Sequence, residues 1–235
     1  GLLDQERSAN VSGQSFEYEG GAGKATYTGS ATLWQGETAI RADRIVLDQA
    51  SGDLIATGDA RSTIVLDTGH SVGRAARIGY TEAARVITYD ATSVPGEAST
   101  ARGSGAAAAK APRPPAELQL AQVSGSQGDL RAARIEIILA KSGSRVERLE
   151  AYARVTMKVD MRTATGARLT YFAGDERYVM TSSGPTPVRV VEQCGDTTGR
   201  TLTFFKASDR IIVDGNEEIR TRRTGSGACS EPSPR

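Results

Sequence analysis

Apolar and polar residues alternate along much of this chain, and the alternation changes phase at recurring places. In the stretch IRADRIVLD, Ile40 and Ala42 occupy even positions, whereas Ile45 and Leu47 occupy odd ones. Alternation with a period of two is typical of a β-strand that buries one face. A one-residue change of phase beside a small residue indicates a β-bulge or a sharp bend of that strand.

The phase change belongs to an internal repeat. Its copies are anchored on Ile45, Ile78, Ile135, Leu169 and Leu202. Successive anchors are 33 or 34 residues apart, except that the second and third are separated further by a segment rich in Ala, Gly and Pro. The small residues three positions before the anchors are Ala42, Ala75, Ala132, Gly166 and Gly199, and the large apolar residues two positions after them are Leu47, Tyr80, Ile137, Tyr171 and Phe204. Such periodicity predicts a repeated supersecondary unit that buries its apolar face against its neighbours.

The repeated unit is predicted to be a β-hairpin. A second apolar strand begins eight to eleven residues after each anchor, at Leu54, Val86, Val146, Tyr178 and Ile211, with turn formers between the two strands. A helical repeat is the competing interpretation, but the copies alternate with period two and break too early for a helix. We therefore expect an all-β fold of repeated antiparallel hairpins, forming a bent, twisted β-jelly roll (β-taco) with an apolar interior.

Composition divides the chain into five segments. We expect a flexible N-terminal segment (1–15), a β-repeat block (16–94), an Ala/Gly/Pro-rich linker or loop (95–117), a second block that continues the same array (118–223) and a flexible tail (224–235).

Charge and hydropathy give no sign of nucleic-acid binding or of a membrane-spanning helix. The 29 basic and 28 acidic side chains nearly cancel, which gives no sign of a nucleic-acid-binding protein. No run approaches the ~18 apolar residues of a membrane helix, and Leu2-Leu3 is too short for a signal-peptide apolar region. We therefore expect a soluble chain that is mature or trimmed.

The residues that usually carry chemistry form no constellation. His70 is the only histidine, and the Asp-Gly and Gly-Asp pairs lie at predicted turns, so no catalytic site, metal site or cofactor is expected and the chain is not predicted to be an enzyme. Cys194 and Cys229 have no CxxC or His companion, and either a disulfide or two free thiols remains open.

An arginine precedes four of the five anchors, at Arg44, Arg77, Arg134 and Arg168, and Thr201 takes the fifth place. On an alternating strand these side chains point away from the apolar face. We expect a solvated outer face, and a row that binds anionic headgroups is the alternative.

Several of these motifs resemble a known family. The segments TGSATLWQGETAIRADRIVLDQASGDLIATGDA (28–60) and VRVVEQCGDTTGRTLTFFKASDRIIVDG (188–215) resemble the OstA-like domain of the lipopolysaccharide-transport bridge, the family of LptA, LptC and the LptD N-terminal domain. The resemblance implies a periplasmic jelly roll that holds the lipid A acyl chains of lipopolysaccharide in an apolar groove. It also implies partners of the same fold, joined end to end by β-strand addition.

The function expected from the resemblance is a non-catalytic, lipopolysaccharide-binding component of the bridge that carries lipopolysaccharide from the inner to the outer membrane. The alternative is a structural or adhesive β-repeat, resembling a β-helix, with a closed core; homo-oligomerisation is also left open. The inward residues expected to bind lipid are Leu33, Ile40, Ile45, Leu47, Leu54, Ile64, Ile78, Tyr80, Val86, Ile135, Ile137, Leu139, Leu169, Tyr171, Leu202, Phe204, Ile211 and Val213.

Overall fold

The computed structural model describes residues 2, 7–91, 120–192, 195–215 and 220–223. These residues form one antiparallel sheet of 18 strands, and a single 3₁₀ turn, η1 (Lys206–Ser208), interrupts it. The strands are β1 (Asn10–Ser12), β2 (Ser15–Glu19), β3 (Lys24–Gln35), β4 (Thr38–Asp48), β5 (Leu54–Leu66), β6 (Gly69–Thr81), β7 (Val86–Asp90), β8 (Ala121–Gly125), β9 (Gly128–Ala132), β10 (Arg134–Leu139), β11 (Val146–Val159), β12 (Arg162–Phe172), β13 (Arg177–Thr181), β14 (Val188–Glu192), β15 (Gly195–Gly199), β16 (Thr201–Phe205), β17 (Arg210–Asp214) and β18 (Arg220–Arg223). The all-β fold of antiparallel hairpins is confirmed.

The five repeat anchors lie in one row across the sheet. Cross-strand pairing runs from Ile45 through Ala56 to Ile78, and continues through Tyr89 to Ile135. The same row reaches Leu169, Leu202 and finally Val213. Because side chains in one such row point to the same face, the repeat places one apolar residue per strand in the interior.

The change of phase is a line of β-bulges. In β3, Gly29 and Ser30 have positive φ angles of 78° and 55° and together face the single residue Asp43 of β4. Two-against-one bulges also place Gly58 and Asp59 of β5, and Ala153 and Arg154 of β11, opposite single residues of their neighbouring strands. A bulge bends its strand, so bulges aligned across neighbouring strands fold the whole sheet along one line.

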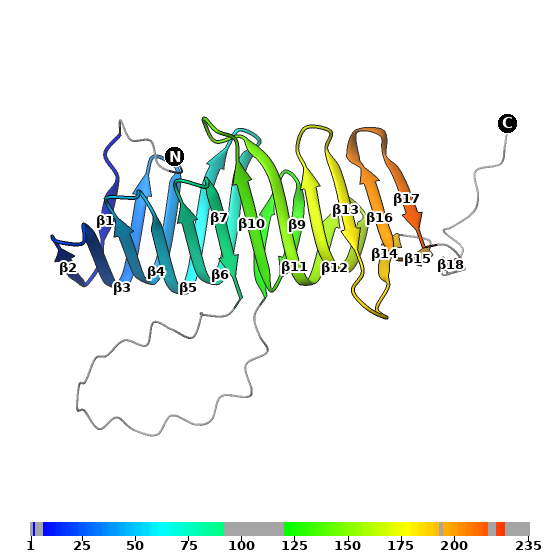
Figure 1. Ribbon diagram of the computed structural model, residues 1–235, viewed down its shortest axis with the longest axis horizontal. Helices are drawn as coiled ribbons and strands as arrows, with labels where there is room; N and C mark the ends of the chain where they lie inside the picture. The colour runs from blue at the N-terminus through cyan, green and yellow to red at the C-terminus, as the bar shows by residue number, and fades with distance from the viewer. Residues whose placement is uncertain (1, 3–6, 92–119, 193–194, 216–219, 224–235) are drawn as a thin grey trace, which may run out of the picture.

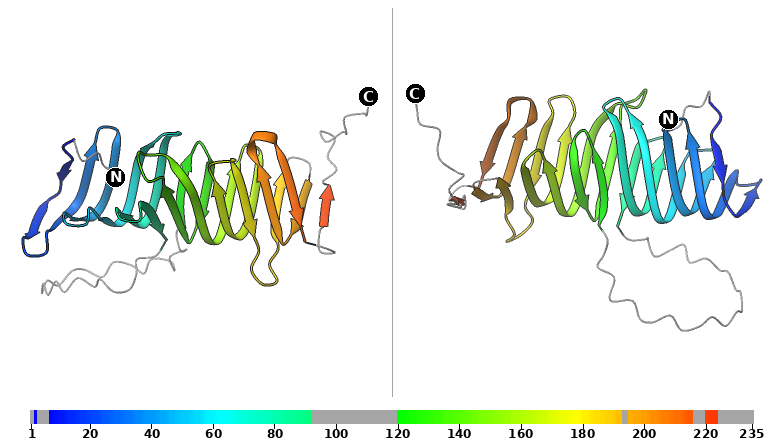
Figure 2. Two further views of the ribbon diagram at one scale, coloured as in Figure 1. Left: turned by 45° about the horizontal axis from the view of Figure 1, so that its top comes forward. Right: turned by 180° about the vertical axis from the view of Figure 1, so that it is seen from behind.

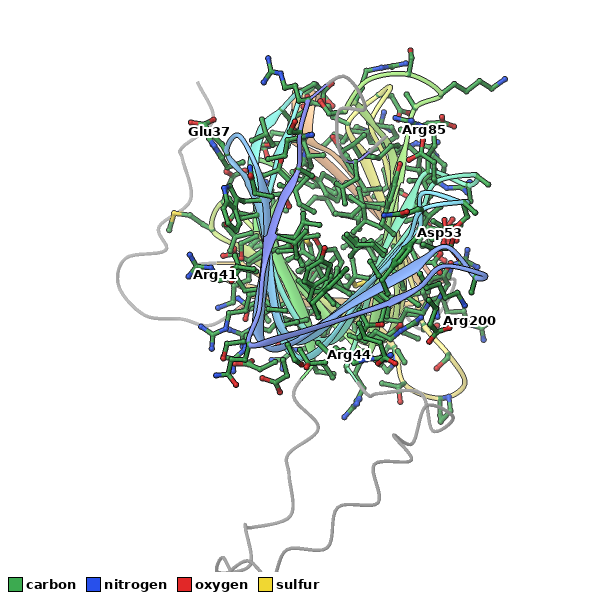
Figure 3. All side chains as sticks on the ribbon, turned by 90° about the vertical axis from the view of Figure 1, so that its left-hand side faces the viewer. Glu37, Arg41, Arg44, Asp53, Arg85 and Arg200 are labelled. Carbon is green, nitrogen blue, oxygen red and sulfur yellow. The ribbon has the colours of Figure 1, made fainter. Side chains whose placement is uncertain are left out.

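The bend line divides the sheet into two walls. The first wall contains β1, β8, β9, β14, β15, β18 and residues 31–35, 38–42, 60–66, 69–75, 155–159 and 162–166 of the longer strands. The second wall contains β2, β7, β10, β13, β16, β17 and residues 24–28, 44–48, 54–57, 77–81, 146–152 and 168–172. Viewed along the long axis, carbon-rich side chains fill the space between the walls, and Arg41 points away from it (Figure 3).

The strands stack along one axis, with β2 and β3 near one end and β16 to β18 near the other (Figures 1 and 2). The two repeat blocks adjoin within the sheet, because β7 pairs with β10 and β6 pairs with β8. The expected linker (95–117) lies outside the described residues, as do the expected tail and both cysteines. The N-terminal segment predicted to be flexible contains β1, which pairs with β3.

Candidate functional site

The interior between the walls is apolar and contains most of the residues that the sequence predicted to point inward. Fourteen of them are at most 5% exposed: Leu33, Ile40, Ile45, Leu54, Ile64, Ile78, Tyr80, Ile135, Ile137, Leu139, Leu169, Tyr171, Leu202 and Phe204. Leu47, Ile211 and Val213 are partly buried and pack against this core. The alternation of the strands therefore locates the apolar face.

Val86 is the exception, and its predicted inward position is wrong. In β7 the buried positions are Ile87 and Tyr89, and Val86 lies out of phase with them. Val86 pairs with Ile138 of β10, the half-buried neighbour of the buried Ile137. Ile87 lies nine residues after its anchor, Ile78, the same spacing as that of Leu54, Tyr178 and Ile211 from their anchors, and it takes the inward position.

The interior is closed around Tyr89. This residue belongs to the second wall, and its hydroxyl lies 2.9 Å from Ser62 Oγ of the first wall. A Cβ atom added at Gly73 of the first wall would lie 2.2 Å from Tyr89 Cε1, so the tyrosine ring lies directly against the opposite backbone. Burial raises the pKa of Tyr89 to about 12, so it stays a neutral hydroxyl.

The interior contains a void nearer the C-terminal end. Its cavity volume is about 30 Å³, and it is partly open to solvent. The lining residues are Met157, Val159, Arg162, Ala164, Leu169, Tyr178, Met180, Val190, Leu202, Phe204 and Ile211. Ten of these eleven side chains are apolar or aromatic, which suits the hydrocarbon part of a ligand.

Sequence reasoning identified four of the void's residues, namely Leu169, Leu202, Phe204 and Ile211. It missed Met157 and Val159, although their alternation in VTMKV carries the same signal as the anchors. It also missed Arg162, for which the single sequence contains no signal. The remaining expected residues, apart from Val86, contribute to the packed interior and do not line the void.

The two walls and the bend between them form a trough. The side of this trough opposite the bend line, called the mouth, is crossed by contacts between the two walls. The Tyr178 hydroxyl donates a hydrogen bond of 2.8 Å to the carbonyl of Gln127. Next to it, Lys206 Nζ donates one of 2.9 Å to the carbonyl of Ser126. Towards the N-terminal end, the turns after β5 and β10 meet through the Asp67 amide and the Ser144 carbonyl, 3.4 Å apart.

Arg162 forms a further contact across the mouth. Its Nε donates a hydrogen bond of 2.9 Å to Glu192 of its own wall, and its terminal nitrogens pair with Asp209 of the second wall. The guanidinium carbon also lies 5.3 Å from the centre of the Phe204 ring. The hydrogen bond to Asp209 and the neighbouring carboxylates raise the pKa of Arg162, and the same hydrogen bond lowers the pKa of Asp209.

On the outer face of the second wall, three of the four arginines that precede the anchors are matched by acids. Arg77 and Arg134 both pair with Asp90, at 3.5 and 3.4 Å. Arg168 pairs with Glu150 at 2.6 Å, and Arg148 pairs with the same carboxylate at 3.0 Å. This row is therefore largely neutralised within the sheet, which favours the solvated outer face over a row of headgroup-binding arginines.

No group of His, Cys, Asp and Glu able to hold a metal occurs among the residues that the structure describes. His70 is exposed at the mouth and lies 3.3 Å from Glu37, another exposed residue. Within the described part of the chain, no helix has the length and apolarity that crossing a membrane requires.

Comparison with known proteins relates this chain to lipopolysaccharide transport. Residues 10–105 match the family described as LptA/(LptD N-terminal domain) LPS transport protein. The chain also aligns with the crystal structure of LptH, the LptA homologous periplasmic component of the lipopolysaccharide transport device from Pseudomonas aeruginosa. That alignment has 11% identity and a TM-score of 0.23, and covers 95% of this chain and 98% of that one.

None of the curated proteins matches the chain. The fold assignment rests on the strands and register described above, and the similarity to the family rests on the sequence match over residues 10–105. The resemblance stated on the motifs of residues 28–60 is thereby confirmed, and the second segment, 188–215, lies outside the matched residues 10–105.

Proposed function

We propose that this protein is a non-catalytic, lipopolysaccharide-binding component of the periplasmic bridge that carries lipopolysaccharide from the inner to the outer membrane. The observation that carries the proposal is the apolar void between the walls, which opens to solvent beside a single arginine. The family match over residues 10–105 supports the same role. In this proposal the trough shields acyl chains from water during transport.

The energetics of acyl-chain binding favour the void. Each methylene of the acyl chain that is removed from water contributes about 0.8 kcal/mol to binding. The apolar lining offers no hydrogen bond that the acyl chain would have to displace. In the conformation described here the void has room for a small group only, and an acyl chain requires the walls to move apart. We therefore place the first contact with lipid at the void, beside Met180 and Leu202.

The remaining inward candidates have a different role in this proposal. Around Tyr89 the walls are joined through the interior, so Ile45, Ile64 and Ile78 form a packed frame that holds the walls in register. Access of lipid to this part depends on separation of the Tyr89 and Ser62 side chains.

The packed region supports the second candidate function, a structural β-repeat whose interior is a closed core. The contact between Tyr89 and Ser62 and the contacts across the mouth favour it. The two functions differ in one respect that can be measured, since a closed core retains no amphiphile.

We propose that the partners join at the ends of the sheet. Among the strands that the structure describes, β2, at one end, pairs with β3 only, and its side chains Phe16 and Tyr18 are 60% and 50% exposed. Strand β17, at the other end, pairs with β16 alone of these strands. Edges of this kind accept a further strand from another chain of the same fold.

Labelling with a photoreactive amphiphile tests the proposed function. A diazirine-bearing dodecyl phosphate should label Met180 and Leu202, which point into the void, more strongly than their outward neighbours Val179 and Thr203. Native mass spectrometry of protein extracted gently from its source should show retained lipid. Equal labelling of both faces, together with lipid-free protein, would support the closed core instead.

A further inference from the structure

Among the described residues that line the void, Arg162 is the only charged one. It begins β12 in the first wall, at the mouth, and its side chain is 24% exposed. A single cation at the entrance of an otherwise apolar void matches the chemistry of an anionic amphiphile, which has a hydrocarbon tail and a charged head.

In the structure the charge of Arg162 is held by two carboxylates from different walls. Glu192 lies on β14, the neighbouring strand of the same wall, and stays with Arg162 if the mouth opens. Asp209 lies in the turn between β16 and β17 of the opposite wall, so its ion pair spans the mouth. Of the two carboxylate contacts of Arg162, only the one with Asp209 has to break for the walls to move apart here.

We propose that the ion pair between Arg162 and Asp209 is a latch over the void, and that the phosphate headgroup of an anionic amphiphile opens it by replacing Asp209 at the guanidinium. This inference deepens the proposed function and rests on it. It assigns the headgroup to Arg162 and the tail to the void, beside Met180 and Leu202.

The surroundings of Asp209 favour the exchange. Its side chain is 70% exposed, so the ion pair is weak and the released carboxylate is hydrated at once. Asp209 also has a φ of 50°, a left-handed conformation that costs a residue with a side chain about 1 kcal/mol or more. A phosphate offers the planar guanidinium the same paired oxygens as the carboxylate does, with more negative charge.

A second contact holds the same turn. Lys206, at the start of η1, donates a hydrogen bond to the Ser126 carbonyl of the first wall. Lys206 and Asp209 therefore fasten one hairpin, β16 and β17, to the opposite wall at two points. Release of Asp209 leaves a single exposed hydrogen bond to hold this hairpin over the void.

Binding of two matched amphiphiles tests the latch. Dodecyl phosphate and dodecyl maltoside have the same tail and differ in the charge of the head. Each would displace the neutral apolar dye N-phenyl-1-naphthylamine from the full chain, below the micelle concentration of the amphiphile. Inorganic phosphate alone forms a third arm, which separates headgroup binding from binding of the free ion.

The variants Arg162→Gln and Asp209→Asn act in opposite directions. Arg162→Gln should weaken dodecyl phosphate about ten- to hundred-fold, since a charge-assisted contact is lost, and should change dodecyl maltoside little. Asp209→Asn removes the competitor and should strengthen dodecyl phosphate about two- to five-fold. The control is Arg189→Gln, which removes the 2.7 Å ion pair with Asp196 on the outer face of the first wall and should leave both affinities unchanged.

The outcomes separate the latch from the function on which it rests. If neither amphiphile displaces the dye from the wild-type chain, the proposed lipid-binding function fails. If both do, but Arg162→Gln weakens them equally or Asp209→Asn weakens dodecyl phosphate, the function stands and the latch is wrong. Unchanged thermal unfolding of Asp209→Asn shows that this variant reports on binding and not on folding. Inorganic phosphate that binds as tightly as dodecyl phosphate would also overturn the latch, because it would place an ion site there without the tail.

Discussion

The hydroxyl of Tyr89 lies 2.9 Å from the Oγ atom of Ser62, and this contact joins the two walls through the middle of an apolar interior. Tyr89 is fully buried in β7 of the second wall, and Ser62 is 3% exposed in β5 of the first. Neither group can turn to water, so each depends on the other for its hydrogen bond. The pair fixes the separation of the walls in this half of the molecule.

Replacing Tyr89 with Phe should therefore lower the free energy of unfolding by about 1–2 kcal/mol, because the Ser62 hydroxyl loses its partner. Urea unfolding followed by circular dichroism measures this difference. If the walls separate to admit lipid, the same variant should also take up N-phenyl-1-naphthylamine more readily. Wild-type stability in Tyr89→Phe would show that Ser62 is satisfied without the tyrosine.

A second prediction concerns the close approach of the walls at Gly73. A Cβ atom here would lie 2.2 Å from Tyr89 Cε1 and 2.8 Å from Ser62 Oγ, so Gly73→Ala should cost about 1–3 kcal/mol through overpacking. Gly79 lies in the same strand, and its nearest contact for an added Cβ is 4.0 Å away, so Gly79→Ala is the control and should be close to neutral. The double variant Gly73→Ala with Tyr89→Ala should lose less free energy of unfolding than the sum of the losses in the two single variants. Simple additivity of these losses would contradict the contact.

The bulges give a third prediction, with a control that separates two causes. Gly58 has a φ of 84°, and an added Cβ would lie 2.7 Å from Asp43 Cβ and closer still to its carboxylate. Gly58→Ala should cost about 2–4 kcal/mol, because backbone strain and steric overlap add. Gly36 has a φ of 58° with nothing within 4 Å, so Gly36→Ala carries the strain alone and should cost about 1–2 kcal/mol. Equal losses in the two variants, again measured by urea unfolding, would mean that the bulge tolerates a side chain.

The bend could be predicted from the sequence because a bulge changes the phase in which apolar and polar residues alternate. The inward set shifts from even to odd positions between Ala42 and Ile45, and the register of the sheet shifts at the same place. The small residues before the anchors also have a physical reason. An added Cβ would lie 2.6 Å from Met180 Cγ at Gly166 and 2.5 Å from Val213 Cγ1 at Gly199.

The remaining features depend on contacts that no local pattern contains. Val86 is an exception: both it and Ile87 are apolar, so alternation alone could not decide which points inward, but the nine-residue spacing in three other copies points to Ile87. Tyr89 and Arg162 act across the trough, on residues far away in the sequence, and such pairs need the fold of the whole sheet before they can be recognised. Leucines and isoleucines of the void and of the packed region alternate alike, so the sequence could not separate the two.

The fourth prediction is a pH dependence centred on Glu150. Its side chain is 7% exposed, and this burial alone would raise the pKa of the carboxyl. Hydrogen bonds from Tyr152 and Arg168, with the charge of Arg148 beside them, outweigh burial and hold the pKa below its ordinary value of 4.5. The unfolded chain therefore takes up this proton at a higher pH than the folded chain does. The stabilisation is present above pH 4.5 and is lost as the pH falls through the lower, folded pKa.

Glu150→Gln tests this dependence. At pH 7 the variant should be less stable than the wild type by about 1–3 kcal/mol, since Arg148 and Arg168 lose a buried partner. The difference should shrink as urea unfolding is repeated at successively lower pH below 4.5. The control is Glu147→Gln at an exposed position of the same strand, which should differ little from the wild type throughout. A Glu150→Gln difference that stays constant down to pH 2 would mean that its ion pairs do not titrate with folding.

The last prediction separates the void from the packed core by filling it. Ala164 lines the void from β12, and Ala164→Leu places three further carbon atoms in that space. Burial of these atoms should leave the free energy of unfolding unchanged or raise it by about 1 kcal/mol, because the space already exists. Binding of dodecyl phosphate and dodecyl maltoside should weaken together, since the tail and not the head loses its place. Ala39→Leu makes the same chemical change on the outer face of the first wall and should weaken neither. A loss of stability in Ala164→Leu would show that the walls are already close-packed there, and unchanged binding of both amphiphiles would move the lipid site away from the void.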